Sequence, residues 1–104
     1  MIIAMSTEYN GVFFDIVDDD PEELKGPLRR HYDLLKSYEA EGKYLGGYYL
    51  PGEDRSMLFF NFEDEAEVDR FFLEDPMSNE FDYEVQVGVP ALEHLVRVLS
   101  QIDS

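Results

Sequence analysis

Apolar and polar positions along the chain follow two different periods, and these predict an alternation of strands and helices. Some short segments are rich in aromatic and β-branched residues and are bounded by turn residues, which is typical of strands. Longer segments repeat apolar residues every three or four positions, which is typical of amphipathic helices. The predicted strands are residues 12–17, 44–50, 56–62 and 83–89, and the predicted helices are residues 22–41, 64–73 and 91–102.

Turn and capping residues support these limits. Pro21 fits an early position of the first helix, and Gly42 fits the residue just after its end. Pro51-Gly52 predicts a turn between the second and third strands. Asp64 and Glu67 have the spacing of a capping box at the start of the second helix. The acidic runs at residues 18–20 and 63–65 are interpreted as solvated helix starts rather than metal loops, because calcium loops need wider, glycine-containing spacing.

The order of elements predicts the fold class. It is α+β, a ferredoxin-like β-α-β-β-α-β arrangement with an antiparallel four-stranded sheet and an added C-terminal helix. The third predicted strand, 56–62, is apolar on both faces. Two helices cover only one face of such a sheet, so the other face needs a cover. We therefore predict a homodimer in which two sheets stack, with the helix 91–102 as an alternative cover or an extension of the dimer contact.

Length, composition and charge narrow the classes of function. The 104 residues fit one domain, and the absence of cysteine excludes disulfides, thiolate metal sites and thiol nucleophiles. We expect a cytoplasmic protein, because no apolar run approaches the ~18 residues that span a membrane and the apolar segment 1–5 is too short and lacks the basic residues of a signal peptide. Met5 is an alternative start of the chain.

The net charge of −16 is the strongest global feature. Nucleic acid and anionic membranes are poor partners for such a chain, so neither is expected. A folded domain with this excess of acidic residues repels itself at low salt. We therefore predict a halophilic protein. Molar salt would screen its charges, with a Debye length of roughly 3 Å.

His31 is the first candidate for chemistry, because it lies on the apolar stripe of the first predicted helix. The other of the two histidines, His94, points away from the apolar stripe of its own helix and is expected to be solvated. An imidazole on an apolar face needs a hydrogen-bond partner or a cavity. His31 is therefore either a core histidine bound to a backbone carbonyl or part of a pocket. Asp75 is a candidate partner that would fix its tautomer, although Asp75-Pro76 is also a common turn opener.

At this point the segments LRRHYDLLKSYEAEGKYLGGYYL and FFLEDPM resemble the YCII-related domain family. The resemblance covers about residues 11–90, which we take as the domain, with residues 91–104 as a C-terminal helical extension. Met77 departs from the aromatic residue that often follows the Asp-Pro of the family. The matching positions are His31, Leu35, Gly42, Gly46, Gly47, Asp75 and Pro76.

The resemblance implies a dimeric α+β barrel with a small pocket between the sheet and the helices. It implies that His31 and Asp75 form the active-site pair. Gly46 and Gly47 would let a small ligand approach the second strand, where Tyr48 would line the pocket, with Tyr44 and Tyr49 as further candidates on the same strand. The alternatives are a bulge or close packing at the glycines and an aromatic core position for the tyrosines.

Two classes of function remain open from the sequence. One is a cofactor-independent enzyme with lyase- or isomerase-type acid–base chemistry at His31, oriented by Asp75. The other is a non-catalytic module of the same fold that binds a small ligand or only dimerises. Neither a phosphate loop nor a dinucleotide fingerprint is present. A haem or metal site at His31 would have too few ligands, so we expect no cofactor and no metal.

Overall fold

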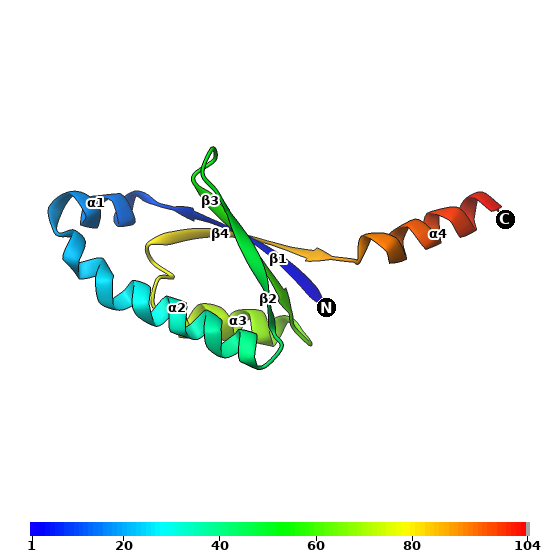
Figure 1. Cartoon of the computed structure of the whole chain (residues 1–104), viewed down its shortest axis with the longest axis horizontal. Coiled ribbons are helices and arrows are strands. Elements are labelled where there is room, and N and C mark those ends of the chain that lie inside the picture. The colour runs from blue at the N-terminus through cyan, green and yellow to red at the C-terminus, as the bar shows by residue number, and fades with distance from the viewer. Residues whose placement is uncertain (104) are drawn as a thin grey trace.

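The computed structural model describes residues 1–103, which form one four-stranded antiparallel sheet and a set of helices (Figure 1). The strand order is β2-β3-β1-β4. This is the α+β ferredoxin-like arrangement predicted from the sequence. The elements are β1 (Ile2–Tyr9), α1 (Gly11–Asp19), the 3-10 helix η1 (Pro21–Leu24), α2 (Lys25–Ala40), β2 (Tyr44–Leu50), β3 (Arg55–Asn61), α3 (Glu65–Glu74), β4 (Phe81–Gly88) and α4 (Ala91–Asp103).

Residues 12–17 are helical, so the prediction of a first strand there is wrong. They lie within α1, and a short apolar run of this kind fits either type of element. The side chain of Asn10 accepts a hydrogen bond from the Phe13 N–H at 3.2 Å and so caps the helix. Phe13 and Ile16, three residues apart, then pack against a small second core cluster.

The first strand is instead β1, which lies in the middle of the sheet between β3 and β4. Its side chains alternate, and Ile3, Met5 and Thr7 are buried on the side of the helices. Residues 2–5 of the apolar N-terminal segment therefore belong to the sheet. The strand also lies wholly before residue 11, so the domain boundary predicted there cuts off a central strand.

The remaining elements fall close to their predicted positions. Strand β2 has the predicted limits, and the Asp64 side chain caps α3 by accepting from the Glu67 N–H at 3.2 Å. The first predicted helix is divided into η1 and α2. Asp18 and Asp19 are exposed in the last turn of α1 rather than at a helix start, so the interpretation as a helix start is wrong for them, and Asp20 leads into η1 at Pro21.

The main core lies between the sheet and the pair α2 and α3, which cover one face (Figure 1). Phe60 and Phe62 stack there with ring centroids 4.9 Å apart, and Phe71 of α3 packs against Phe60. On the opposite face, Met57 and Phe59 of β3 are only half-buried, because no element of residues 1–103 covers them. The uncovered face is therefore partly apolar, as the sequence indicates.

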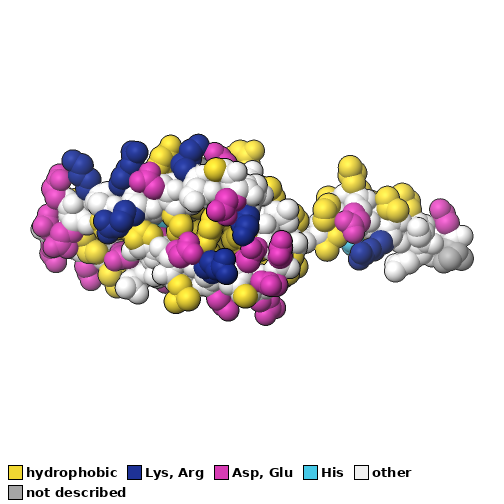
Figure 2. All heavy atoms as spheres, turned by 90° about the horizontal axis from the view of Figure 1, so that it is seen from below, with side chains coloured by type: hydrophobic (Ala, Val, Ile, Leu, Met, Phe, Trp, Pro, Cys, Tyr) yellow, Lys and Arg dark blue, Asp and Glu magenta, His cyan; other side chains and the backbone are white. Residues whose placement is uncertain are grey.

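Helix α4 projects from the body at the end of β4 and forms a separate lobe (Figures 1 and 2). It stretches the molecule to 62 × 30 × 19 Å. His94 on this helix is exposed, as predicted. Among residues 1–103, no helix has both the length and the apolar composition that crossing a membrane requires. The apolar side chains of α4 are also exposed: Leu92, Leu95, Val96, Leu99 and Ile102.

Candidate active site

His31 lies where the apolar stripe of α2 passes over a cavity in front of the sheet. The stripe faces the core as predicted, since Leu24 and Tyr38 near its two ends are buried. Between them, Leu28, His31 and Leu35 line a cavity of about 200 Å³. The sheet supplies the opposite wall, through side chains of β1, β2, β3 and β4. The imidazole is thus placed at the boundary between the packed core and an open cavity.

The carboxylate of Asp75 binds this imidazole directly. His31 Nδ1 lies 2.8 Å from Asp75 Oδ1, although the two residues are 44 positions apart in the sequence. The Asp75 side chain is fully buried, and the His31 side chain is 14% exposed. The ring of His31 also meets the ring of Phe81 edge to face, with centroids 5.4 Å apart. The ring is therefore held by a hydrogen bond on one side and by an aromatic contact on another.

Asp75 owes its position to the end of α3. Its N–H still bonds to the Phe71 carbonyl at 2.9 Å, but its own backbone is extended, because the residue before a proline avoids the helical region. Oδ1 also accepts the Met77 N–H at 3.0 Å, which closes an Asx-type turn. The Asp75 side chain therefore opens the turn and binds His31 at the same time.

Tyr83 of β4 completes the surroundings of the carboxylate by donating its hydroxyl to Asp75 Oδ2. Burial by itself would raise the pKa of Asp75. The hydrogen bonds from His31, Tyr83 and the Met77 N–H outweigh burial and hold the pKa below its ordinary value. Burial and the bond to Asp75 raise the pKa of Tyr83, so the phenol stays a proton donor. The carboxylate therefore remains charged beside the imidazole at neutral pH.

This geometry determines which nitrogen of His31 is available for chemistry. A charged carboxylate accepts only, so Nδ1 carries the proton that binds Asp75. In the neutral ring Nε2 then has the free lone pair, and among residues 1–103 this nitrogen has no hydrogen-bond partner. A neutral imidazole with a free Nε2, oriented by a buried carboxylate, is the arrangement of a general base.

The glycines and the tyrosine predicted to bind ligand do not join this site. Gly46 adopts φ +110° at an irregularity in the pairing of β2 with β3, so the bulge interpretation describes it. A Cβ on Gly47 would collide with the Met57 carbonyl oxygen, which explains glycine there by close packing. Tyr48 is 74% exposed and does not line the His31 cavity. The neighbouring Tyr49 lines it instead.

Several site residues were not predicted from the sequence. Tyr83 is predicted only as the first residue of the strand 83–89, and its bond to Asp75 depends on how β4 passes α3. Thr7 and Tyr9 line the cavity from β1, the strand that the sequence pattern missed. The available signals were the apolar run 2–5, which fits a strand, and Asn10, which fits the cap of a following helix.

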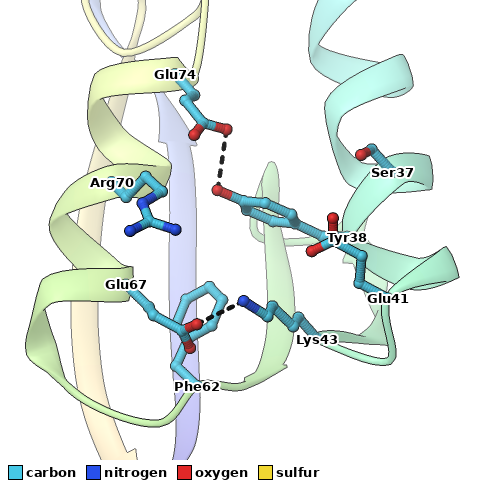
Figure 3. Close-up of a pocket in the computed structure, with 8 residues that line it drawn as sticks. All are labelled: Ser37, Tyr38, Glu41, Lys43, Phe62, Glu67, Arg70 and Glu74. Carbon is cyan, nitrogen blue, oxygen red and sulfur yellow. Dashed lines mark hydrogen bonds and ion pairs between the residues drawn. The ribbon is translucent and has the colours of Figure 1, made fainter.

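A second cavity of about 150 Å³ lies between the end of α2 and α3 (Figure 3). Two pairs of its polar side chains bind each other: Tyr38 donates to Glu74 at 3.1 Å, and Lys43 lies 2.5 Å from Glu67. Burial and the bond to Glu74 raise the pKa of Tyr38 to about 12. These contacts join α2 to α3, and we interpret the cavity as structural. Residues 1–103 contain no cluster of three His, Cys, Asp or Glu side chains that would hold a metal ion.

Proteins that resemble this chain are found among solved structures. No protein-family model matches the chain, and no curated protein matches it. Among solved structures, the fold is similar to that of 5-chloro-2-hydroxyhydroquinone dehydrochlorinase (TftG) from Burkholderia phenoliruptrix AC1100, determined in complex with 2,5-dihydroxybenzoquinone. The TM-score is 0.59 and the identity 19%, over 86% of this chain and 94% of that one. The likeness supports the α+β ferredoxin-like fold.

Proposed function

We propose that the protein is a cofactor-independent acid–base catalyst of a small organic molecule, with His31 as the base and Asp75 as its orienting carboxylate. The single observation that carries the proposal is the His31–Asp75 pair at the wall of an open cavity. A core histidine would be enclosed and bonded to a backbone carbonyl. Here the partner is a buried carboxylate, and the second ring nitrogen has none among residues 1–103.

The size of the cavity limits the substrate. An apolar cavity of roughly 150 Å³ holds a benzene molecule, so about 200 Å³ accommodates one six-membered ring with a few substituents. The structurally similar TftG is named as a dehydrochlorinase and was solved with a single-ring quinone. Dehydrochlorination as a reaction type includes the removal of a proton, which a histidine base supplies. Both observations favour small cyclic compounds over polymers or nucleotides.

The proposed step is abstraction of a proton from carbon. Nε2 of His31 takes the proton next to a carbonyl group. The C–H electron pair forms a C=C bond, and the carbonyl π pair moves to oxygen, which gives an enolate. Asp75 stabilises the imidazolium that results. The same imidazolium then returns a proton to carbon. In an elimination, the enolate instead re-forms C=O, its C=C pair moves toward the β-carbon, the leaving group departs from that carbon with its bonding pair, and the imidazolium releases its proton to the leaving group or to water.

Hydrogen exchange tests this step without knowledge of the natural substrate. We expect the protein to accelerate exchange of the α-hydrogens of cyclohexanone for deuterium in D₂O, followed by ¹H NMR. His31→Gln should lower the rate ~10²–10⁴-fold, which is the contribution of a positioned base. His94→Gln is the matched control, because His94 is exposed on α4. Equal rates for wild type and His31→Gln would show that His31 is not the base.

The proposal includes a homodimer in a salt-rich cytoplasm. Two copies would stack the faces that carry Met57 and Phe59, and the exposed apolar stripe of α4 would extend the contact. A second copy also offers the sheet a cover that residues 1–103 do not provide. Sedimentation equilibrium in KCl tests this point, and a monomer across the micromolar range would contradict it.

A further inference from the structure

Four hydroxyl-bearing side chains form a row across the sheet, one from each strand. Tyr49 of β2 is paired with Ser56 of β3, Ser56 with Thr7 of β1, and Thr7 with Tyr83 of β4. Directly paired residues of an antiparallel sheet share a face, so all four side chains lie on the face that α2 and α3 cover. Thr7, Ser56 and Tyr49 line the same cavity as His31.

The two ends of this hydroxyl row are occupied, whereas its middle is not. Tyr83 donates to Asp75, and Tyr49 donates to Asp54. Thr7 is 93% buried, and its Oγ1 has no hydrogen-bond partner among residues 1–103. Ser56 beside it makes no side-chain hydrogen bond within the same residues. Buried hydroxyls without a partner are rare in folded proteins, because they lose their hydrogen bonds to water. Thr7 and Ser56 both line the cavity, so a ligand there would offer their hydroxyls the partner that the protein does not.

The charge around the cavity indicates what kind of oxygen these hydroxyls meet. Among residues 1–103, Arg55 is the only basic residue of the wall besides His31, and its Nε already binds Glu53 at 2.6 Å. Leu28, Leu35 and Leu58 make much of the remaining wall apolar. The chain as a whole carries a net charge of −16, which repels anions. An uncharged ligand with a polar oxygen fits this combination better than a carboxylate or a phosphate.

We propose that the Thr7 and Ser56 hydroxyls bind the carbonyl oxygen of a neutral, enolisable ring compound. This inference rests on the proposed function and names its substrate class. When His31 Nε2 takes the α-proton, the C–H pair forms the C=C bond and the negative charge develops on the carbonyl oxygen. Thr7 and Ser56 donate hydrogen bonds to that oxygen. Donors preorganised in this way stabilise developing charge, as oxyanion holes do.

Thr7→Val is the decisive variant, because valine keeps the shape of threonine and removes the hydroxyl. It should lower kcat/KM for deuterium exchange of cyclohexanone ~10²-fold, the loss expected for one oxyanion donor. It should leave the melting temperature unchanged or higher, since no protein hydrogen bond is lost. Thr7→Ser retains a hydroxyl and should exchange close to the wild-type rate. Cyclohexanecarboxylate serves as the anionic probe and should bind more weakly than cyclohexanone.

The outcomes separate this inference from the proposed function. Exchange that requires His31 but is unchanged in Thr7→Val would overturn the inference alone. A marked fall in the melting temperature of Thr7→Val would also overturn it, because the hydroxyl would then have a structural partner. Tighter binding of cyclohexanecarboxylate, abolished by Arg55→Gln, would overturn the neutral substrate class. No exchange of cyclohexanone by the wild type would contradict both the inference and the proposed function.

Discussion

Replacement of Asp75 by alanine removes the acceptor on which the candidate site is built. The buried carboxylate accepts three hydrogen bonds, from His31 Nδ1, from the Met77 N–H and from the Tyr83 hydroxyl. Met77 is completely buried and Tyr83 is half-buried, so water cannot fully replace the lost acceptor for either donor. His31 is partly exposed and can turn toward solvent. The variant therefore leaves two donors unsatisfied.

The expected cost follows from these two donors. An unsatisfied buried donor costs about 1–3 kcal/mol, so we expect Asp75→Ala to lower the free energy of unfolding by roughly 2–6 kcal/mol. This is a large share of the roughly 5–15 kcal/mol that stabilises a typical domain. Asp75→Asn keeps one acceptor oxygen and nearly the same volume, so it should cost less than Asp75→Ala.

Urea unfolding in KCl, followed by circular dichroism, measures this difference. An unchanged dependence of the unfolding free energy on urea would show that the variants expose the same surface on unfolding. Asp69→Ala is the matched control, because Asp69 is exposed on α3 and makes no side-chain hydrogen bond within residues 1–103. The control should stay within about 0.5 kcal/mol of wild type. A similarly small effect for Asp75→Ala would refute the hydrogen-bond network.

The remaining predictions concern pH, salt, the dimer and β2. The pKa of Asp75 is lower in the folded state than in the unfolded state, where it is about 3.9. The charged carboxylate therefore stabilises the fold above that value, and this stabilisation is lost as pH falls through the folded pKa. Acid titration should bring the unfolding free energies of wild type and Asp75→Asn together. The melting temperature should rise with KCl, because screening weakens repulsion at a net charge of −16, and a flat profile would contradict the halophilic prediction. Phe59→Arg should shift the sedimentation equilibrium toward monomer without unfolding the chain. Gly47→Ala should lower the melting temperature, because its Cβ would collide with β3, whereas Gly52→Ala, in open space, should not.

The sequence predicts most elements well where turn residues and periodicity agree. Gly42 and the turn at residues 51–52 bound β2 on both sides, and its predicted limits match the structure. The first strand was misplaced because residues 12–17 are apolar in a short run that fits both element types. The Asn10 cap and the pairing of residues 2–9 with two strands settle the choice in the folded chain.

The candidate site was predictable in part. The spacing of the α2 stripe places His31 toward the sheet, and the resemblance to the YCII-related family singles out Asp75; the structure places the two in hydrogen-bond contact. Thr7 and Tyr83 were not predicted, because their roles depend on strand register, which the sequence does not reveal without the correct first strand. Gly46 and Gly47 show the reverse case, since their unusual backbone serves the sheet rather than a ligand.

The central claim is that His31 presents a free Nε2 to a ligand in the cavity, and NMR of the two histidines tests it most directly. Long-range ¹H–¹⁵N spectra report the tautomer of each imidazole, and cyclohexanone is then added in steps. We predict that His31 is protonated on Nδ1 and that its ring signals shift saturably, while those of the exposed His94 do not move. A proton on Nε2 of neutral His31, or ring signals of His31 that do not respond to the ligand, would contradict the account.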